Sequence, residues 1–129
     1  MTARAVLDTS VLIAQAPVAA GVEAAISTVS IAELHFGVLL ARDDDERARR
    51  TTRLGLIESR FPAPLAVDDR VAREWGRLRA AVAQRGGSPR KRVADLAIAA
   101  TANVHGAAFC TLNPKDLAIV ADLVDVRAP

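Results

Sequence analysis

The sequence predicts an α/β domain, a three-layer α/β/α sandwich in which helices cover both faces of a mostly parallel sheet of four to five strands. Short apolar segments alternate along the chain with longer segments of helical periodicity, as in strand–helix–strand units. The strand-like segments are almost wholly apolar, which is typical of parallel strands. With 129 residues, 51% of them hydrophobic, the chain has the size of one domain, residues 1–129, with its own core.

The first half of the chain predicts two strands and two helices. We expect, in chain order, a strand at 4–8, a loop at 14–21, a strand at 24–28 and helices at 29–41 and 43–60. Residues 29–41 are apolar on almost every side, which is typical of a buried helix. Residues 43–60 begin with acidic side chains and continue with basic ones, the order that the helix dipole favours.

The second half continues the alternation. We expect a strand at 65–67, a helix at 69–84 with Asp68 as its cap, a flexible basic loop at 85–92, a helix from 93 that Gly106 ends, a strand at 107–111, a turn at 112–116 and a last strand at 123–126. In the helix at 69–84, apolar residues recur on one face, so Trp75 is expected in the core. We see no internal repeat and no linker.

Charge and cysteine content narrow the function classes. The net charge is +2, and 15 of the 17 basic residues are arginine, the side chain best shaped to bind phosphate. The single cysteine, Cys110, excludes an internal disulfide. Asp8 interrupts the only apolar run near the amino end, and no segment is long enough to cross a membrane. We therefore expect a cytoplasmic protein.

Four carboxylates lie in or beside apolar segments. Asp8 ends the first strand, Glu33 and Asp95 lie early in apolar helices, and Asp116 follows the strand at 107–111. Ligands of parallel sheets bind beyond the carboxyl ends of the strands, where these four acids can meet. Oxygen-only ligands suit Mg²⁺ or Mn²⁺, and grouped carboxylates repel one another unless a cation or protons neutralise them.

Each acid also has a purely structural interpretation. Asp8 can cap the turn that Thr9 and Ser10 begin, and Ser30 with Glu33 has the spacing of a capping box. Asp95 suits the positive end of its helix, and Asp116 can cap a helix after the turn at 113–114. Taken together, four independent structural roles at one edge of one sheet explain the four acids less well than a shared metal site does.

The residues resemble a known family. The segments VLDTSVLIA, STVSIAELHFG, ADLAIAATA and TLNPKDL occur in the order and approximate spacing of the PIN domain, and are most similar to VapC-type toxins. The resemblance extends from Arg4 to about Val126. It implies a magnesium-dependent endoribonuclease, with Mn²⁺ as the alternative ion, that cuts RNA, binds a VapB-type antitoxin and forms a homodimer.

The resemblance also implies a role for particular residues. Catalytic acids are Asp8, Glu33, Asp95 and Asp116, and the metal ligands among them are Asp8, Asp95 and Asp116. Thr9, Ser10, Thr111 and Asn113 match polar residues that support the acids by hydrogen bonds. The fourth segment departs from the family pattern, because Leu112 and Leu117 replace an arginine and a phenylalanine, which makes Asp116 the least secure match.

These residues predict hydrolysis by an activated water. Asp8 and Asp95 would bind the ion and Glu33 would position or deprotonate the water, whereas Asp116 would serve a second ion. Arg90, Lys91 and Arg92 are candidates for contact with the RNA backbone.

Three other functions are weighed against the nuclease. A haloacid-dehalogenase phosphatase needs a second aspartate where this chain has Ser10, and a phosphoacceptor receiver domain needs an acidic pair that is missing. The remaining alternative is a catalytically weak PIN fold that binds RNA or protein.

Overall fold

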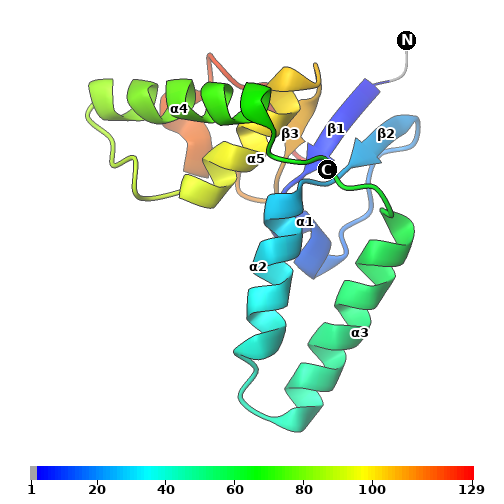
Figure 1. Ribbon diagram of the computed structural model, residues 1–129. Coiled ribbons are helices and arrows are strands. Elements are labelled where there is room, and N and C mark those ends of the chain that lie inside the picture. The colour runs from blue at the N-terminus through cyan, green and yellow to red at the C-terminus, as the bar shows by residue number, and fades with distance from the viewer. Residues whose placement is uncertain (1–2) are drawn as a thin grey trace.

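The computed structural model describes residues 3–129 and has a four-stranded parallel sheet at its centre (Figure 1). The strands are β1 (Ala3–Leu7), β2 (Val22–Ala25), β3 (Ala108–Cys110) and β4 (Val126–Arg127), in the spatial order β2-β1-β3-β4. Each neighbouring pair is parallel. The helices are α1 (Thr9–Ala14), α2 (Thr28–Leu39), α3 (Asp44–Arg60), α4 (Asp69–Gln84), α5 (Val93–Val104) and the 3-10 helix η1 (Pro114–Val120).

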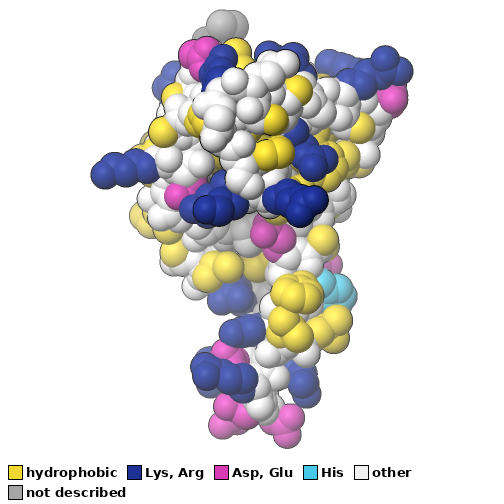
Figure 2. Space-filling model, turned by 90° about the vertical axis from the view of Figure 1, so that its left-hand side faces the viewer, with side chains coloured by type: hydrophobic (Ala, Val, Ile, Leu, Met, Phe, Trp, Pro, Cys, Tyr) yellow, Lys and Arg dark blue, Asp and Glu magenta, His cyan; other side chains and the backbone are white. Residues whose placement is uncertain are grey.

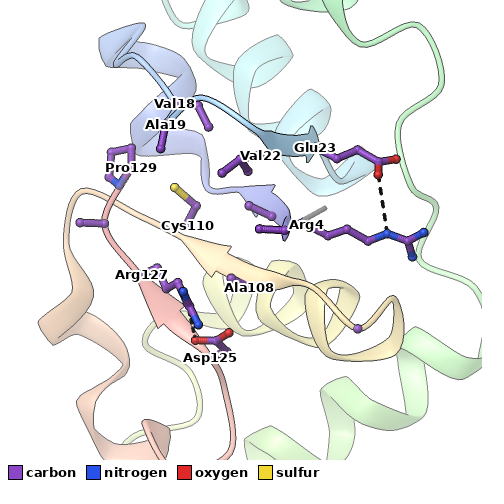
Figure 3. A pocket seen from close by; sticks show the side chains of 14 residues that line it. Arg4, Val18, Ala19, Val22, Glu23, Ala108, Cys110, Asp125, Arg127 and Pro129 are labelled. Atoms are coloured by element: carbon purple, nitrogen blue, oxygen red, sulfur yellow. Dashed lines mark hydrogen bonds and ion pairs between the residues drawn. The ribbon is translucent and has the colours of Figure 1, made fainter. Parts of the chain in front are cut away.

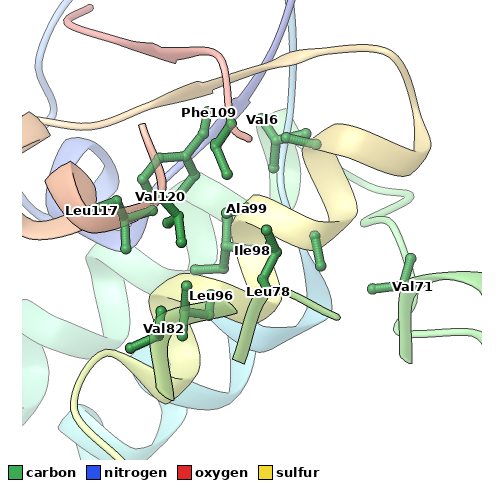
Figure 4. Packing of buried hydrophobic residues seen from close by; sticks show 13 residues of the cluster. Val6, Val71, Leu78, Val82, Leu96, Ile98, Ala99, Phe109, Leu117 and Val120 are labelled. Carbon is green, nitrogen blue, oxygen red and sulfur yellow. The ribbon is translucent and has the colours of Figure 1, made fainter. Parts of the chain in front are cut away.

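Two hydrophobic layers lie on opposite faces of the sheet. Alternate residues of a strand point to opposite faces, so Val6 and Phe109 pack with α4, α5 and η1 (Figure 4). Ala5, Leu7 and Cys110 pack on the other face with α1, α2 and α3. The predicted three-layer α/β/α architecture with a parallel sheet is confirmed.

Small side chains bring α5 close to its neighbours. Four alanines of α5 are fully buried, namely Ala97, Ala99, Ala100 and Ala102. Trp75 of α4 packs against this layer and donates its indole N–H to the Val93 carbonyl at 3.1 Å. The expectation that Trp75 belongs to the core is therefore confirmed. Because α5 is held on both sides, its first turn has a fixed position beside the sheet.

Local details differ from the expectations. Residues 9–14 form the helix α1, which the sequence reading did not assign, and residues 114–120 form a 3-10 helix where only a turn was expected. The predicted strand at 65–67 is wrong, because Leu65 makes only an isolated bridge to Ser27. The last strand comprises Val126 and Arg127 only.

The expectation of a buried helix at 29–41 is also wrong. The helices α2 and α3 run side by side away from the sheet as a two-helix arm, residues 28–60 (Figure 1). Four large apolar side chains of the arm are between 59% and 70% exposed, namely Phe36, Leu39, Leu40 and Leu56. Figure 2 shows hydrophobic side chains gathered on the lower part of the molecule, where the arm lies. The arm therefore presents apolar surface that residues 3–129 do not cover.

No helix within residues 3–129 combines the length and the apolar character that crossing a bilayer requires.

Substitution of Leu78 by Ala is expected to lower the free energy of unfolding by about 2–5 kcal/mol, because the fully buried side chain would leave a cavity. Leu56→Ala makes the same change on the exposed arm, and should alter the free energy by about 0.5 kcal/mol or less. Urea denaturation of both variants measures the difference. Equal losses would contradict the assignment of Leu78 to the core and Leu56 to the surface.

Candidate metal centre

Asp8 is held at the edge of the sheet where the carboxyl ends of the strands meet, which we call the carboxyl edge. It follows β1, caps the first turn of α1 and is 5% exposed. Its Oδ1 accepts a hydrogen bond from the backbone N–H of Thr9 at 2.8 Å. Its Oδ2 accepts from the hydroxyls of Ser10 at 2.8 Å and Thr111 at 2.9 Å. These donors offset the desolvation of a buried carboxylate and fix its orientation.

A second layer of backbone donors fixes these two hydroxyls. The N–H of Leu112 donates to Ser10 Oγ at 3.2 Å, and the N–H of Asn113 donates to Thr111 Oγ1 at 3.1 Å. The backbone N–H of Asp8 also donates to the Cys110 carbonyl at 2.8 Å. The predicted support from Asn113 therefore comes from its backbone, and the end of β3 is tied to the start of α1.

Glu33 joins the site through Thr9. The Thr9 hydroxyl donates to Glu33 Oε1 at 2.5 Å and lies 3.0 Å from the Ser30 hydroxyl. Because Thr9 has only one proton to donate, Ser30 is the donor in the second contact. The fully buried Ser30 thus helps to orient Glu33 through Thr9, a role that the sequence reading missed. Its position three residues before Glu33 was the available signal.

The capping-box interpretation of Ser30 and Glu33 is wrong. The residue that caps α2 is Ser27, whose hydroxyl accepts from the Val29 N–H at 3.0 Å. Ser30 and Glu33 lie inside the helix, where they face Thr9. The structure therefore removes the structural explanation that the sequence offered for Glu33.

Asp95 lies in the first turn of α5 and has an altered acidity. Burial, followed by the negative charges of Asp8 and Glu33, raises the pKa of Asp95 from 3.8 to about 6. Arg92 opposes this increase in pKa, and Asp116 adds to it. The other three predicted acids thus lie close enough to act electrostatically on Asp95, and we call the four together the acidic site.

Asp116 lies in the first turn of η1 and is paired with a cation. Arg92 Nη2 donates to Asp116 Oδ1 at 3.0 Å, and Arg92 Nη1 lies 4.0 Å from Asp95 Oδ2. The interpretation of Asp116 as a helix cap is wrong, because Asn113 occupies the cap position. Arg92, which the sequence grouped with Arg90 and Lys91 as an RNA contact, lies among the acids.

The donor set fits Mg²⁺ or Mn²⁺ held by few protein ligands. Within residues 3–129, no three His, Cys, Asp or Glu side chains converge tightly enough to enclose a metal ion by themselves. Magnesium commonly keeps several waters and binds one or two carboxylates together with substrate phosphates. The fixed Asp8 carboxylate and the partly buried Asp95 meet that requirement. Cys110 is buried, and burial raises the pKa of its thiol, which disfavours a thiolate ligand.

A pocket of about 690 Å³ lies elsewhere, on the face of the sheet (Figure 3). Small apolar residues such as Ala5, Ala108 and Val22 form much of its lining, and Figure 3 shows the ion pairs Arg4–Glu23 and Arg127–Asp125 beside it. None of the four acids lines this pocket. Its volume alone therefore does not make it the reactive centre.

Comparisons with known proteins agree with this fold. The profile of the PIN domain matches residues 5–123. The chain is 42% identical to ribonuclease VapC5 of Mycobacterium tuberculosis over 106 residues, which cover 78% of this chain and 76% of the relative. It is 36% identical to ribonuclease VapC4 of the same organism, with 93% of each chain covered.

A solved structure of a similar protein has the same fold. In the crystal structure of VapBC-5 from M. tuberculosis, a member of the VapBC family of toxin–antitoxin systems, one chain superposes with a TM-score of 0.78 at 34% identity. The superposition covers 98% of this chain and 97% of that one.

The raised pKa of Asp95 predicts a pH-dependent stability. Between about pH 4 and pH 6 the folded protein binds a proton at Asp95 that the unfolded chain releases, so this group destabilises the fold as pH rises through that range. Asp95→Asn should therefore stabilise the metal-free protein at pH 7.5 by about 2 kcal/mol. Below about pH 3 the difference should vanish, because Asp95 is then mostly protonated in both states.

Chemical denaturation at a series of pH values measures this effect, with Asp69→Asn as the control. Asp69 lies in the first turn of α4 with its side chain 79% exposed, so its substitution should change the free energy of unfolding by about 0.5 kcal/mol or less. A pH-independent effect of Asp95→Asn would contradict the raised pKa.

Proposed function

This chain belongs to the PIN-domain family, and from that membership we propose that it is the ribonuclease toxin of a toxin–antitoxin pair. The proposal is supported by two relatives named ribonucleases, at 42% and 36% identity. The observation that carries it is the buried Asp8 carboxylate, fixed at the carboxyl edge beside Asp95 and Glu33. The reaction that this site supports best is hydrolysis of RNA phosphodiester bonds with Mg²⁺, or alternatively Mn²⁺.

Each residue of the acidic site has its own role in the hydrolysis. When bound, a divalent cation neutralises charge on the scissile phosphate and acidifies a water. Asp8 and Asp95 would hold the cation, and the donors around Asp8 keep its carboxylate in one orientation. Glu33, which Thr9 holds by one oxygen, positions or deprotonates the attacking water. Asp116 takes part when RNA brings a second cation. Attack by water leaves a 5′-phosphate and a 3′-hydroxyl, not a cyclic phosphate.

The RNA backbone binds beside the acidic site. On the face of the molecule that Figure 2 draws, Lys and Arg side chains lie around acidic ones at mid-height. Arg90 and Lys91 are exposed on the segment that leads into α5, a few residues before Asp95. Their charges attract phosphates to the edge of the site, where the metal-binding carboxylates lie.

The partner is a VapB-type antitoxin. The similar M. tuberculosis chain belongs to a toxin–antitoxin complex, and it matches this chain over nearly its whole length. The exposed apolar arm offers surface for a protein partner, either the antitoxin or a second copy in a homodimer. We place the protein in the cytoplasm, where its RNA substrate is found.

A catalytically weak binding module is the second candidate. Leu112 is 42% exposed directly after Thr111, at the position where the PIN pattern has an arginine. A side chain that cannot bind phosphate at this position favours weaker catalysis. RNA binding without metal-dependent cleavage would support this candidate against the nuclease.

Metal-stripped protein, free of antitoxin, is expected to cut RNA only after addition of Mg²⁺ or Mn²⁺. Asp8→Asn should reduce the cleavage rate by at least about 100-fold, because it removes the fixed charge that holds the cation. Gel assays with end-labelled RNA measure both the rate and the product ends. Asp69→Asn, an exposed change of the same chemistry, should cut like the wild type. Cleavage that survives Asp8→Asn, or a cyclic phosphate product, would overturn the mechanism.

The double variant Arg90→Ala with Lys91→Ala is expected to weaken RNA binding at low salt. Loss of two phosphate contacts should also reduce the slope of log affinity against log salt by about 1–2. Binding is measured by fluorescence anisotropy in the Asp8→Asn background, so that the RNA remains intact. An unchanged affinity and slope would remove both residues from the RNA-binding surface.

A further inference from the structure

We propose that Arg92 is a built-in counter-ion of the acidic site, which pairs with Asp95 and Asp116 in the metal-free protein and competes with a divalent cation for Asp95. The inference rests on the proposed function, since it concerns how access to the same site is controlled. It gives Arg92 a role different from that of its neighbours Arg90 and Lys91.

The geometry places one guanidinium between two carboxylates. Arg92 Nη2 donates to Asp116 Oδ1 at 3.0 Å, while Nη1 lies 4.0 Å from Asp95 Oδ2. The side chains of Asp95 and Asp116 are 22% and 30% exposed, so water screens these pairs less than it screens a fully exposed pair. The planar fork of arginine suits a contact with two acids at once.

The backbone of Arg92 is in an unusual conformation. Arg92 occupies the N-cap position of α5 with φ 62° and ψ 25°, in the left-handed region, and makes no side-chain capping bond. N-caps are normally extended and are usually Ser, Thr, Asp or Asn. A left-handed conformation costs a residue other than glycine about 1–2 kcal/mol. Such strain persists where the surrounding structure enforces it, and it is common at functional sites.

The segment that carries Arg92, where the sequence predicts a flexible basic loop at 85–92, is anchored at its beginning. Arg85 donates to the Ile119 carbonyl at 2.8 Å and pairs with Asp122 at 2.6 Å. At Gly87 the chain lies so close to its neighbours that a Cβ would be 2.7 Å from Ile119 and 2.9 Å from Val82. The segment is therefore fastened to η1, the helix that bears Asp116, before it reaches Arg92.

Asp8 differs from Asp95 and Asp116 in the kind of donor that stabilises it. Among residues 3–129, the donors to Asp8 are all neutral, namely the Thr9 N–H and the hydroxyls of Ser10 and Thr111, which leave its negative charge available to a cation. Asp95 and Asp116 share the positive charge of Arg92. A cation held by Asp8 and Asp95 competes with the guanidinium for the Asp95 carboxylate, so Arg92 lowers the affinity of the site.

The test is Mn²⁺ binding to metal-stripped protein without RNA, measured by electron paramagnetic resonance of free Mn²⁺. Arg92→Gln should bind Mn²⁺ about fivefold more tightly than the wild type, which is about 1 kcal/mol of lost competition. Arg92→Lys, which keeps the charge but lacks the planar fork, should bind Mn²⁺ with an affinity between those of the wild type and Arg92→Gln. Lys115→Gln removes a charge next to Asp116 that makes no ion pair within residues 3–129, and should change the affinity by about twofold at most.

Thermal melting of each variant establishes that it is folded before binding is compared. Equal Mn²⁺ affinity of wild type and Arg92→Gln would overturn the inference and leave the metal site standing. An equal gain in Lys115→Gln would also overturn it, because a general charge effect would then suffice. If neither wild type nor Arg92→Gln bound Mn²⁺, the proposed metal-dependent function would fail together with the inference.

Discussion

The burial of one charged group, the Asp8 carboxylate, sets the conditions that the rest of the site meets. A carboxylate that is 5% exposed requires hydrogen-bond donors, and this one receives them from α1 and from the residue after β3. Those segments meet only because β1 and β3 are adjacent parallel strands. The order of the strands is therefore what allows a charged carboxylate to be buried at this site.

Two kinds of donor contact the acidic site: neutral groups at Asp8 and the charged guanidinium of Arg92 at Asp95 and Asp116. Hydroxyl and amide groups orient Asp8 without cancelling its charge, whereas Arg92 offsets charge at Asp95 and Asp116. Between them, Glu33 depends on a chain of hydroxyls through Thr9 and Ser30. Four acids are tolerated in a small volume because neutral donors stabilise Asp8 and Glu33, whereas Asp95 and Asp116 share the charge of Arg92.

Much of the fold and the identity of the four acids follow from the sequence, since strand–helix alternation and buried carboxylates are local signals. The helix α1 was missed because the segment at 5–14 is apolar except for Asp8, Thr9 and Ser10, and a short apolar segment fits a strand as well as a buried helix. The exposure of α2 was missed because an apolar sequence does not tell whether its own chain or another chain covers it. The Arg92–Asp116 pair joins residues 24 positions apart, so it depends on how η1 packs.

The distance along the chain between Asp8 and its donor Thr111 has a consequence for biosynthesis. The two residues are 103 positions apart in a chain of 129. Ribosomes release a chain from its amino end, so Asp8 emerges long before β3, which Thr111 follows, can pair with β1. Asp8 in a nascent chain therefore lacks the hydroxyl of Thr111 as a donor until β3 has left the ribosome and paired with β1.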